Sequence, residues 1–224
     1  MVVLSIIVPV YNEKYNVALL AKSLLNVFKK TKFEIIFVDD SSPDGTADTI
    51  RSLKGFGNRI KLVERSGKLG LATAVVEGVK AAKGKLLLVM DGDLSHPPEI
   101  AYKLFLASKN YDLVIASRNV TGKRTHTSHR DFISMGAESL CRPLIGNKFT
   151  DPMSGFFLVK KNIISHTNIR VKGYKILLNL LHDNKDLKVK ELPYIFGARY
   201  SGETKLDLNE GLAYLFDLFR LILR

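Results

Sequence analysis

The sequence predicts a single α/β domain, in which a mostly parallel sheet is flanked by helices. Short apolar runs rich in β-branched residues alternate with longer segments of helical periodicity, and the connections between them are short. The 224 residues contain no internal repeat, low-complexity stretch or linker, so one domain accounts for the length. In such a sheet, ligands bind beyond the carboxyl ends of the strands.

The alternation is clearest at the start of the chain. Residues 2–8 form an apolar, β-branched run that ends at Pro9, which is typical of a strand buried on both faces. A helical pattern over residues 13–29 precedes a second buried strand at 33–38. The Ser-Pro-Asp-Gly-Thr turn at 42–46 then leads into a further helix.

The same pattern continues with a third strand at residues 60–63. A helix of small residues follows at 69–82 and is ended by Gly84. The fourth strand, at 86–90, is stopped by Asp91.

The pattern loosens after Arg118. Before that residue, a helix is expected at 98–108 and a strand at 113–116. Beyond it, the signals are shorter, and they predict a mobile basic loop at 122–130, a helix at 132–144, a strand at 156–159, a helix at 175–182 and a strand at 187–191.

Acidic residues stand where three of the predicted strands end. The three features are Asn12 with Glu13, Asp39 with Asp40, and Asp91-Gly92-Asp93. Each one alone is explained about equally well as a helix cap. Because the carboxyl ends of parallel strands meet at one edge, the three together indicate a ligand site there.

The Asp91-Gly92-Asp93 segment predicts a metal site. Two carboxylates two residues apart, with a flexible glycine between them, suit a hard divalent cation such as Mg²⁺ or Mn²⁺. A cation held by so few carboxylates takes its other ligands from substrate phosphates and water. The expected ligand is therefore a nucleoside diphosphate.

Several other classes of site are excluded by their missing motifs. The first strand is followed by Pro-Val-Tyr-Asn-Glu instead of a Gly-x-Gly-x-x-Gly turn, and the sequence contains no Walker loop, zinc spacing or Gly-x-Ser-x-Gly elbow. The five histidines are scattered and are interpreted as structural or solvated. A single cysteine, Cys141, fits a reducing compartment. The net charge of +12 attracts polyanions without identifying which kind.

Taken together, these segments resemble the family-2 glycosyltransferases, which have the GT-A fold, and among them the branch that mannosylates dolichyl phosphate. The likeness covers nearly the whole chain. It rests on residues 8–13, 38–46, 90–99, 117–118, 151–156, 173–175 and 199–205.

The resemblance implies GDP-mannose as donor, dolichyl or another polyprenyl phosphate as acceptor, and Mg²⁺ or Mn²⁺ as cofactor. It implies that the base and ribose of GDP contact Pro9, Tyr11, Glu13, Val38 and Asp40. It places the diphosphate at Asp91, Gly92 and Asp93, and the metal at Asp93, Ser95 and Asp91. The residues that face phosphates would be Arg118, Lys175 and Arg199, and the acceptor phosphate would meet Arg130 and Ser134.

The implied reaction needs a way to stabilise the departing diphosphate. The metal at Asp91 and Asp93, together with Arg199, would take up its charge, so these three residues are the expected catalytic groups. A lipid phosphate has a second pKa near ~6 and needs no proton removed, so no general base is expected. Arg118, with Arg130 and Lys175, would hold the acceptor phosphate, and direct attack would invert the anomeric carbon.

The last segment, 207–224, is expected to form an amphipathic helix behind a catalytic domain at 1–206. Its leucines and phenylalanines recur at helical spacing. The helix would either lie in a membrane interface or pack on the body of the protein. No run reaches the ~18–20 apolar residues of a membrane span. A peripheral position on the cytoplasmic face of a membrane is expected, and a membrane-anchoring subunit or domain is a further expected partner.

Besides a catalytically silent nucleotide-binding subunit of a membrane complex, against which the intact Asp91 and Asp93 pair argues, two alternatives stay open from the sequence. The first is a transferase of the same fold that uses a UDP-sugar to glycosylate a polyprenyl phosphate with glucose or an aminosugar. The second is a basic nucleic-acid-binding module, which the charge permits. The chain has no RNP-like strand, helix-turn-helix signature or zinc finger, and no nucleic-acid partner is expected.

Overall fold

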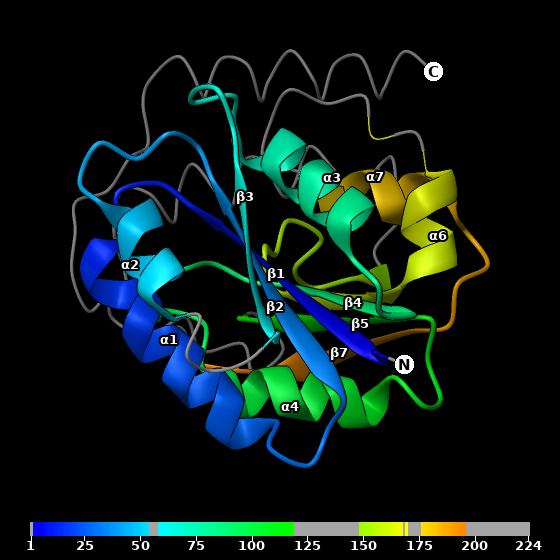
Figure 1. Ribbon diagram of the computed structural model, residues 1–224. Coiled ribbons are helices and arrows are strands. Elements are labelled where there is room, and N and C mark those ends of the chain that lie inside the picture. Colours follow the sequence, from blue (N-terminus) through cyan, green and yellow to red (C-terminus); the bar gives the residue numbers. More distant parts are fainter. Residues whose placement is uncertain (1, 54–57, 119–147, 168, 170–175, 196–224) are drawn as a thin grey trace.

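The computed structural model describes residues 2–53, 58–118, 148–167, 169 and 176–195 (Figure 1). The loop predicted at 122–130 and the helices predicted at 132–144 and 207–224 lie outside the described residues. The division into a domain at 1–206 and a terminal helix therefore stays a prediction.

A seven-stranded sheet forms the centre of the described structure, in the order β3-β2-β1-β4-β6-β5-β7. Strand β6 is antiparallel to both of its neighbours, and the other pairings are parallel. The mostly parallel sheet predicted from the sequence is confirmed. The strands are β1 (Leu4–Val10), β2 (Phe33–Asp39), β3 (Ile60–Glu64), β4 (Leu86–Val89), β5 (Leu113–Ser117), β6 (Phe157–Lys160) and β7 (Val189–Pro193).

Helices cover both faces of the sheet (Figure 1). One face carries α1 (Lys14–Val27), α2 (Thr46–Ser52) and α4 (Pro98–Ala107). The other carries α3 (Leu71–Ala81), α6 (Lys161–His166) and α7 (Ile176–Asp183). The six-residue helix α6 was not predicted, because so short a helix shows too few turns for its periodicity to be recognised.

Pro9 was predicted to end the first strand, and this prediction was wrong. The strand continues to Val10, and Pro9 pairs with Val38 of β2. The pairing of β1 with β4 stops at Ile7, whose carbonyl accepts the N–H of Met90. Successive residues of a strand point their backbone groups to opposite sides, so the missing N–H of Pro9 faces the β4 side, beyond the last paired residue. Proline is tolerated there because no ladder bond is lost.

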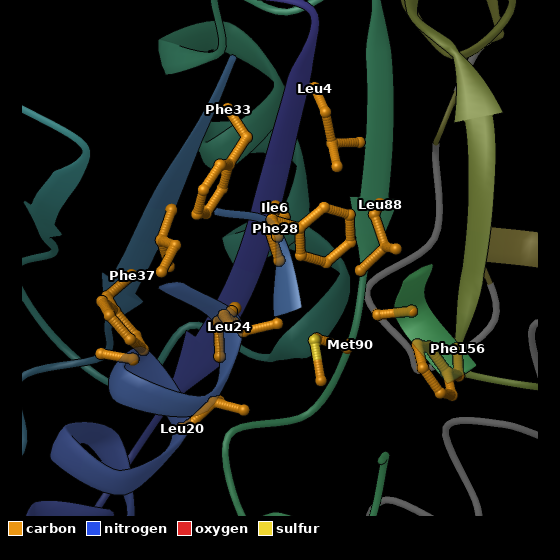
Figure 2. Close-up of a cluster of buried hydrophobic side chains, with 14 of the residues drawn as sticks. Leu4, Ile6, Leu20, Leu24, Phe28, Phe33, Phe37, Leu88, Met90 and Phe156 are labelled. Carbon is orange, nitrogen blue, oxygen red and sulfur yellow. The ribbon is translucent and has the colours of Figure 1, made fainter. Parts of the chain in front are cut away.

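Apolar side chains fill a layer on each side of the sheet. Residues of β1 alternate between the two layers: Leu4, Ile6 and Val8 pack with α1 and α4, whereas Ile7 packs with α3 and α7. Figure 2 shows the first layer, where the ring of Phe28 lies 5.4 Å from that of Phe33. Because both faces are covered, each large apolar side chain that the strands bury contributes about 1.5–3 kcal/mol.

A buried carboxylate, that of Glu34, joins three strands at the end of the sheet opposite the predicted site. Glu34 of β2 accepts hydrogen bonds from the Ser5 hydroxyl (2.7 Å), the Lys83 N–H (2.6 Å) and Lys61 Nζ (2.6 Å). Burial alone would raise the pKa of Glu34, but these hydrogen bonds and the positive charge of Lys61 together lower it. Glu34 therefore remains ionised and links β2, β1 and β3 away from the predicted site.

The described helices are short compared with the thickness of a lipid bilayer. None of them is both long enough and apolar enough to cross one.

Candidate active site at the carboxyl ends of the strands

The predicted acidic features meet where the strand order reverses. From β1 the chain proceeds to β2 and β3 on one side, and β4 pairs with β1 on the other, which makes the β1–β4 crevice the switch point of the sheet. A Cβ placed on Gly92 would lie 2.8 Å from Val10 Cγ1, so the loop after β4 rests directly on the end of β1. On the other side, the N–H of Asp40 donates to the Val10 carbonyl (3.2 Å). The three strand ends therefore converge, as predicted.

The backbone beyond each of these strands adopts a left-handed conformation. Asn12, Ser41 and Leu94 have φ angles of 55°, 59° and 66° and follow β1, β2 and β4. This conformation costs a residue with a side chain about 1–2 kcal/mol, most of all a bulky one such as leucine. Such residues persist where surrounding contacts hold them, and they are concentrated at functional sites.

The two carboxylates of the Asp-x-Asp segment have different surroundings. Asp93 is buried, and its Oδ1 accepts hydrogen bonds from the Ser95 N–H (3.0 Å) and hydroxyl (2.5 Å). The Asp91 side chain is 39% exposed. One carboxylate is thus fixed in the protein, and the other is accessible to a ligand. Ser95 is fully buried and supports Asp93, and its own place in a metal site stays a prediction.

His96 fixes the position of the Asp91-Gly92-Asp93 segment. Its Nδ1 accepts the backbone N–H of Asp91 at 2.9 Å, and its ring stacks on Phe156 with 4.5 Å between centroids. Burial lowers the pKa of His96, against the opposite effect of the nearby Asp91. The neutral ring carries its proton on Nε2, 3.7 Å from Asp91 Oδ2. The structural interpretation of this histidine is confirmed, and its position directly after the Asp-x-Asp segment is the signal that could have placed it in the site.

Tyr194 packs with His96 and Phe156 in one aromatic cluster, and it was not singled out from the sequence. Its buried ring meets those of His96 (5.9 Å) and Phe156 (5.6 Å) edge-on. Burial raises the pKa of its phenol well above the ordinary value. The cluster joins the loop after β4 to the segments before β6 and after β7.

Arg118 reaches the site from the end of β5. Its Nε and Nη2 donate to the two carboxylate oxygens of Asp151 (2.9 and 3.2 Å). The Arg118 side chain is 37% exposed, whereas Asp151 is completely buried. Asp151 and Gly155 belong to one short segment, and a Cβ placed on Gly155 would lie 3.7 Å from Asp91 Oδ1, so the segment that holds the guanidinium also passes beside the Asp91 carboxylate. The buried partner Asp151 was part of a recognised motif, but no role had been assigned to it.

The residues predicted to contact the nucleotide lie in the last residues of β1 and β2 or just beyond them. Glu13 is buried. Its backbone N–H donates a hydrogen bond to Thr46 Oγ1 (2.9 Å), and its Oε2 accepts one from Asn16 Nδ2 (2.5 Å). Val38 is fully buried in the layer next to α3, and its contact with a nucleotide stays a prediction. Pro9 is partly buried at the end of β1.

Asp40 and Tyr11 are both contacted by the segment that follows β3. Asp40 is buried and forms an ion pair with Arg65 (2.5 Å), and its Oδ2 accepts the N–H groups of Leu69 and Gly70. The ammonium of Lys68 lies 5.2 Å from the centre of the Tyr11 ring. Neither Arg65 nor Lys68 was singled out from the sequence.

The remaining predicted site residues, Arg130, Ser134, Lys175 and Arg199, lie outside the described residues. Within the part of the chain that the structure describes, no group of three or more His, Cys, Asp or Glu side chains is arranged to hold a metal. The pair Asp91 and Asp93 still fits a cation that completes its coordination with substrate phosphates and water.

Comparison with known proteins supplies the family. The family model described as glycosyl transferase family 2 matches residues 5–167. The dolichol-phosphate mannosyltransferase of Pyrococcus furiosus is 38% identical over 97% of this chain, which spans 63% of that relative. Those of Mycosarcoma maydis and Saccharomyces cerevisiae are 37% and 36% identical, over 97% and 96% of this chain and 78% and 85% of theirs. The chain thus spans less than two thirds of the Pyrococcus relative and most of the fungal ones.

Solved structures agree on the fold. Mannosyl-3-phosphoglycerate synthase from Rubrobacter xylanophilus superimposes with a TM-score of 0.73 at 16% identity, covering 98% of this chain and 73% of that one. Glucosyl-3-phosphoglycerate synthase from Mycobacterium tuberculosis gives a TM-score of 0.73 at 19% identity, covering 99% and 77%. The predicted GT-A architecture is confirmed, and the chain belongs to glycosyl transferase family 2.

Proposed function

We propose that this glycosyltransferase transfers mannose from GDP-mannose to dolichyl or another polyprenyl phosphate, with inversion at the anomeric carbon. The observation that carries the proposal is the segment 150–155, which holds the Arg118 guanidinium at Asp151 and passes beside the accessible Asp91 carboxylate at Gly155. It offers a place for a donor diphosphate and an acceptor phosphate side by side. The three relatives at 36–38% identity that are named dolichol-phosphate mannosyltransferase support the choice of sugar and lipid.

The donor half of the proposal rests on the Asp-x-Asp segment. Asp91 and Asp93, with Ser95, are the residues that would hold Mg²⁺ or Mn²⁺. Such an ion neutralises charge on a diphosphate leaving group. The protein's own part is to keep Asp93 fixed through Ser95 and Asp91 fixed through His96, so that the ligands need no reordering when the donor binds.

The acceptor half rests on Arg118. The attacking oxygen belongs to a phosphate that is largely dianionic at neutral pH, so no base has to remove a proton. This oxygen forms a bond to C1 of mannose while the bond from C1 to the diphosphate oxygen breaks, and GDP departs with the electron pair. A guanidinium already held by Asp151 can orient the nucleophile by charge-assisted hydrogen bonds.

The proposal also includes a peripheral position on the cytoplasmic face of a membrane, because the acceptor is a lipid. Residues 207–224 are the segment proposed to contact that surface. Deleting them should reduce sedimentation of the protein with vesicles that contain anionic lipid. Unchanged sedimentation would remove this part of the proposal and leave the reaction itself in place.

The direct test is a transfer assay. The protein is incubated with radiolabelled GDP-mannose, a polyprenyl phosphate and Mg²⁺ or Mn²⁺, and the products are extracted into organic solvent. Label should enter the lipid phase only when a divalent cation is present, and Asp91→Asn should lower the transfer by about a hundredfold or more. Transfer from UDP-glucose but not from GDP-mannose would establish the UDP-sugar alternative, and calorimetric titration of both donors would show the same preference.

A further inference from the structure

A short segment before β6 links the two halves of the site. Residues 150–155 carry Asp151, which holds the Arg118 guanidinium, and Gly155, which lies beside Asp91. A Cβ placed on Gly155 would be 3.7 Å from Asp91 Oδ1. The position of this segment therefore influences the distance between the Arg118 guanidinium and the Asp91 carboxylate.

Two contacts seat the segment on the end of β5. The Ser154 hydroxyl donates to the Ala116 carbonyl (2.7 Å), and the hydroxyls of Ser117 and Thr150 are 2.7 Å apart. These contacts fix the segment on one side. They do not hold the backbone N–H groups of residues 150 and 151, which point to the neighbouring strand β7.

Those N–H groups are held by Glu191. Its Oε1 accepts the N–H of Thr150 and the N–H of Asp151, both at 3.0 Å, and its Oε2 is 3.0 Å from the Thr150 nitrogen. A carboxylate that accepts from two successive N–H groups fixes the peptide between them by charge-assisted hydrogen bonds. The side chain of Asp151 starts from that peptide, and it is completely buried.

We propose that Glu191 is a positioning residue for Arg118, acting through the backbone and carboxylate of Asp151. The inference rests on the proposed function, in which Arg118 binds a substrate phosphate. Asp151 takes both Nε and Nη2 of Arg118, so the direction of the guanidinium follows the position of the Asp151 carboxylate. A guanidinium ordered in advance binds phosphate without the cost of ordering a long side chain.

Asp112 provides a matched control at the other end of the same strands. Its carboxylate accepts the N–H of Lys188, just before β7, at 3.0 Å and pairs with Lys160 Nζ at 2.6 Å. Like Glu191, it is a carboxylate that joins the β5 region to a neighbouring strand by accepting a backbone N–H. Because it lies at the opposite end of β5 from Arg118, its loss should affect stability alone.

The kinetic test compares Glu191→Ala, Asp112→Ala, Arg118→Ala and the double variant Glu191→Ala/Arg118→Ala. Glu191→Ala should raise KM for polyprenyl phosphate between about ten- and a hundredfold, whereas Asp112→Ala should stay within about twofold of the wild type.

Glu191→Gln, which keeps an acceptor oxygen, should recover part of the loss. If Glu191 acts through Arg118, the double variant should be no worse than Arg118→Ala. Equal KM values for Glu191→Ala and Asp112→Ala, or additive effects in the double variant, would overturn the proposal.

A second measurement needs no substrate. In protein labelled with ¹⁵N-arginine, the Nε–H signal of Arg118, assigned by its loss in Arg118→Lys, should exchange faster with solvent in Glu191→Ala and be unchanged in Asp112→Ala. If the wild type fails to use GDP-mannose, the proposed function fails, and this signal still decides the role of Glu191. Unchanged exchange in Glu191→Ala would refute the positioning role, whatever the reaction is.

Discussion

The backbone N–H of Asp91 donates a 2.9 Å hydrogen bond to Nδ1 of His96, so the accessible carboxylate of the site is tied to a buried ring. The ring is held in turn by its stack on Phe156. This arrangement converts a flexible segment that contains a glycine into one with a defined position.

Removing the acceptor on His96 should impair the reaction more than the fold. His96→Phe keeps an aromatic ring against Phe156 but leaves the Asp91 N–H without this acceptor, and kcat/KM should fall about tenfold or more. His96→Asn offers an oxygen near the position of Nδ1 and should lose less. Steady-state kinetics with thermal unfolding will check this. The expectation fails if the two variants have equal kcat/KM.

Asp91 and Asp93 should respond differently to neutralisation. Asp91→Asn affects an exposed carboxylate, so turnover should fall by about a hundredfold or more while Tm stays close to the wild-type value. Asp93→Asn also disturbs the hydrogen bonds from Ser95 and should lower Tm as well. Calorimetric unfolding and the transfer assay separate the two effects. Wild-type turnover in Asp91→Asn would contradict the assignment.

Gly155→Ala should make the protein slightly more stable and less active. Its Cβ would stand in ordinary contact with the Asp91 carboxylate and the His96 ring, so it narrows the space beside Asp91 without a clash. Replacing a compatible glycine by alanine stabilises by about 0.4–1 kcal/mol through the unfolded chain. Gly67→Ala, where a Cβ would meet nothing within 4 Å, is the control for the stability effect. A Gly155→Ala protein with unchanged affinity for a metal–nucleotide complex would contradict the prediction.

Acid should weaken the fold through Glu34. Its pKa is lowered from the ordinary 4.5, despite the opposing effect of burial, by hydrogen bonds from Lys61, Lys83 and Ser5 and by the charge of Lys61. A depressed pKa means that Glu34 contributes stability above pH 4.5 and that this contribution is lost as pH falls towards the folded-state pKa.

Urea unfolding between pH 3 and 7 will measure this contribution. Glu34→Gln should be less stable than the wild type at pH 7 by about 1–3 kcal/mol, and the difference should shrink as the pH is lowered below 4.5. Glu77→Gln, which alters an exposed pair with Lys80, should show neither effect. A difference that does not change with pH would indicate that packing, and not charge, sets the contribution of Glu34.

Much of the fold could be predicted because local patterns determine it. The alternation of buried strands with amphipathic helices predicted the bounds of the seven described strands and of α1, α3, α4 and α7 to within about three residues. Parallel pairing then brings Asn12, Asp40 and Asp91 to one edge. Strand order is not local, so the insertion of β6 between β4 and β5 could not be read from its own apolar run. Pro9 shows the same limit, since its place inside β1 depends on where β4 ends.

The chemistry of the site was predicted in kind but not in its contacts. Spacing alone indicated that Asp91 and Asp93 form a pair, but not that one is buried and the other accessible. The ion pair of Asp40 with Arg65 joins residues 25 positions apart, and that of Arg118 with Asp151 joins residues 33 apart. Such partners become visible only when the strands are assembled.

The reversed direction of β6 has a consequence for how the protein can change. The carboxyl ends of the other strands point towards the site. Strand β6 runs in the opposite direction, so its amino-terminal end and the segment before it lie at the site. The residues proposed to contact the nucleotide and the metal lie at or just beyond the carboxyl ends of β1, β2 and β4, whereas Asp151, which holds the Arg118 guanidinium, lies in the segment that leads into β6. We therefore expect substitutions around Asp151 in this segment to change acceptor binding, and substitutions at Gly155, beside Asp91, to change donor binding.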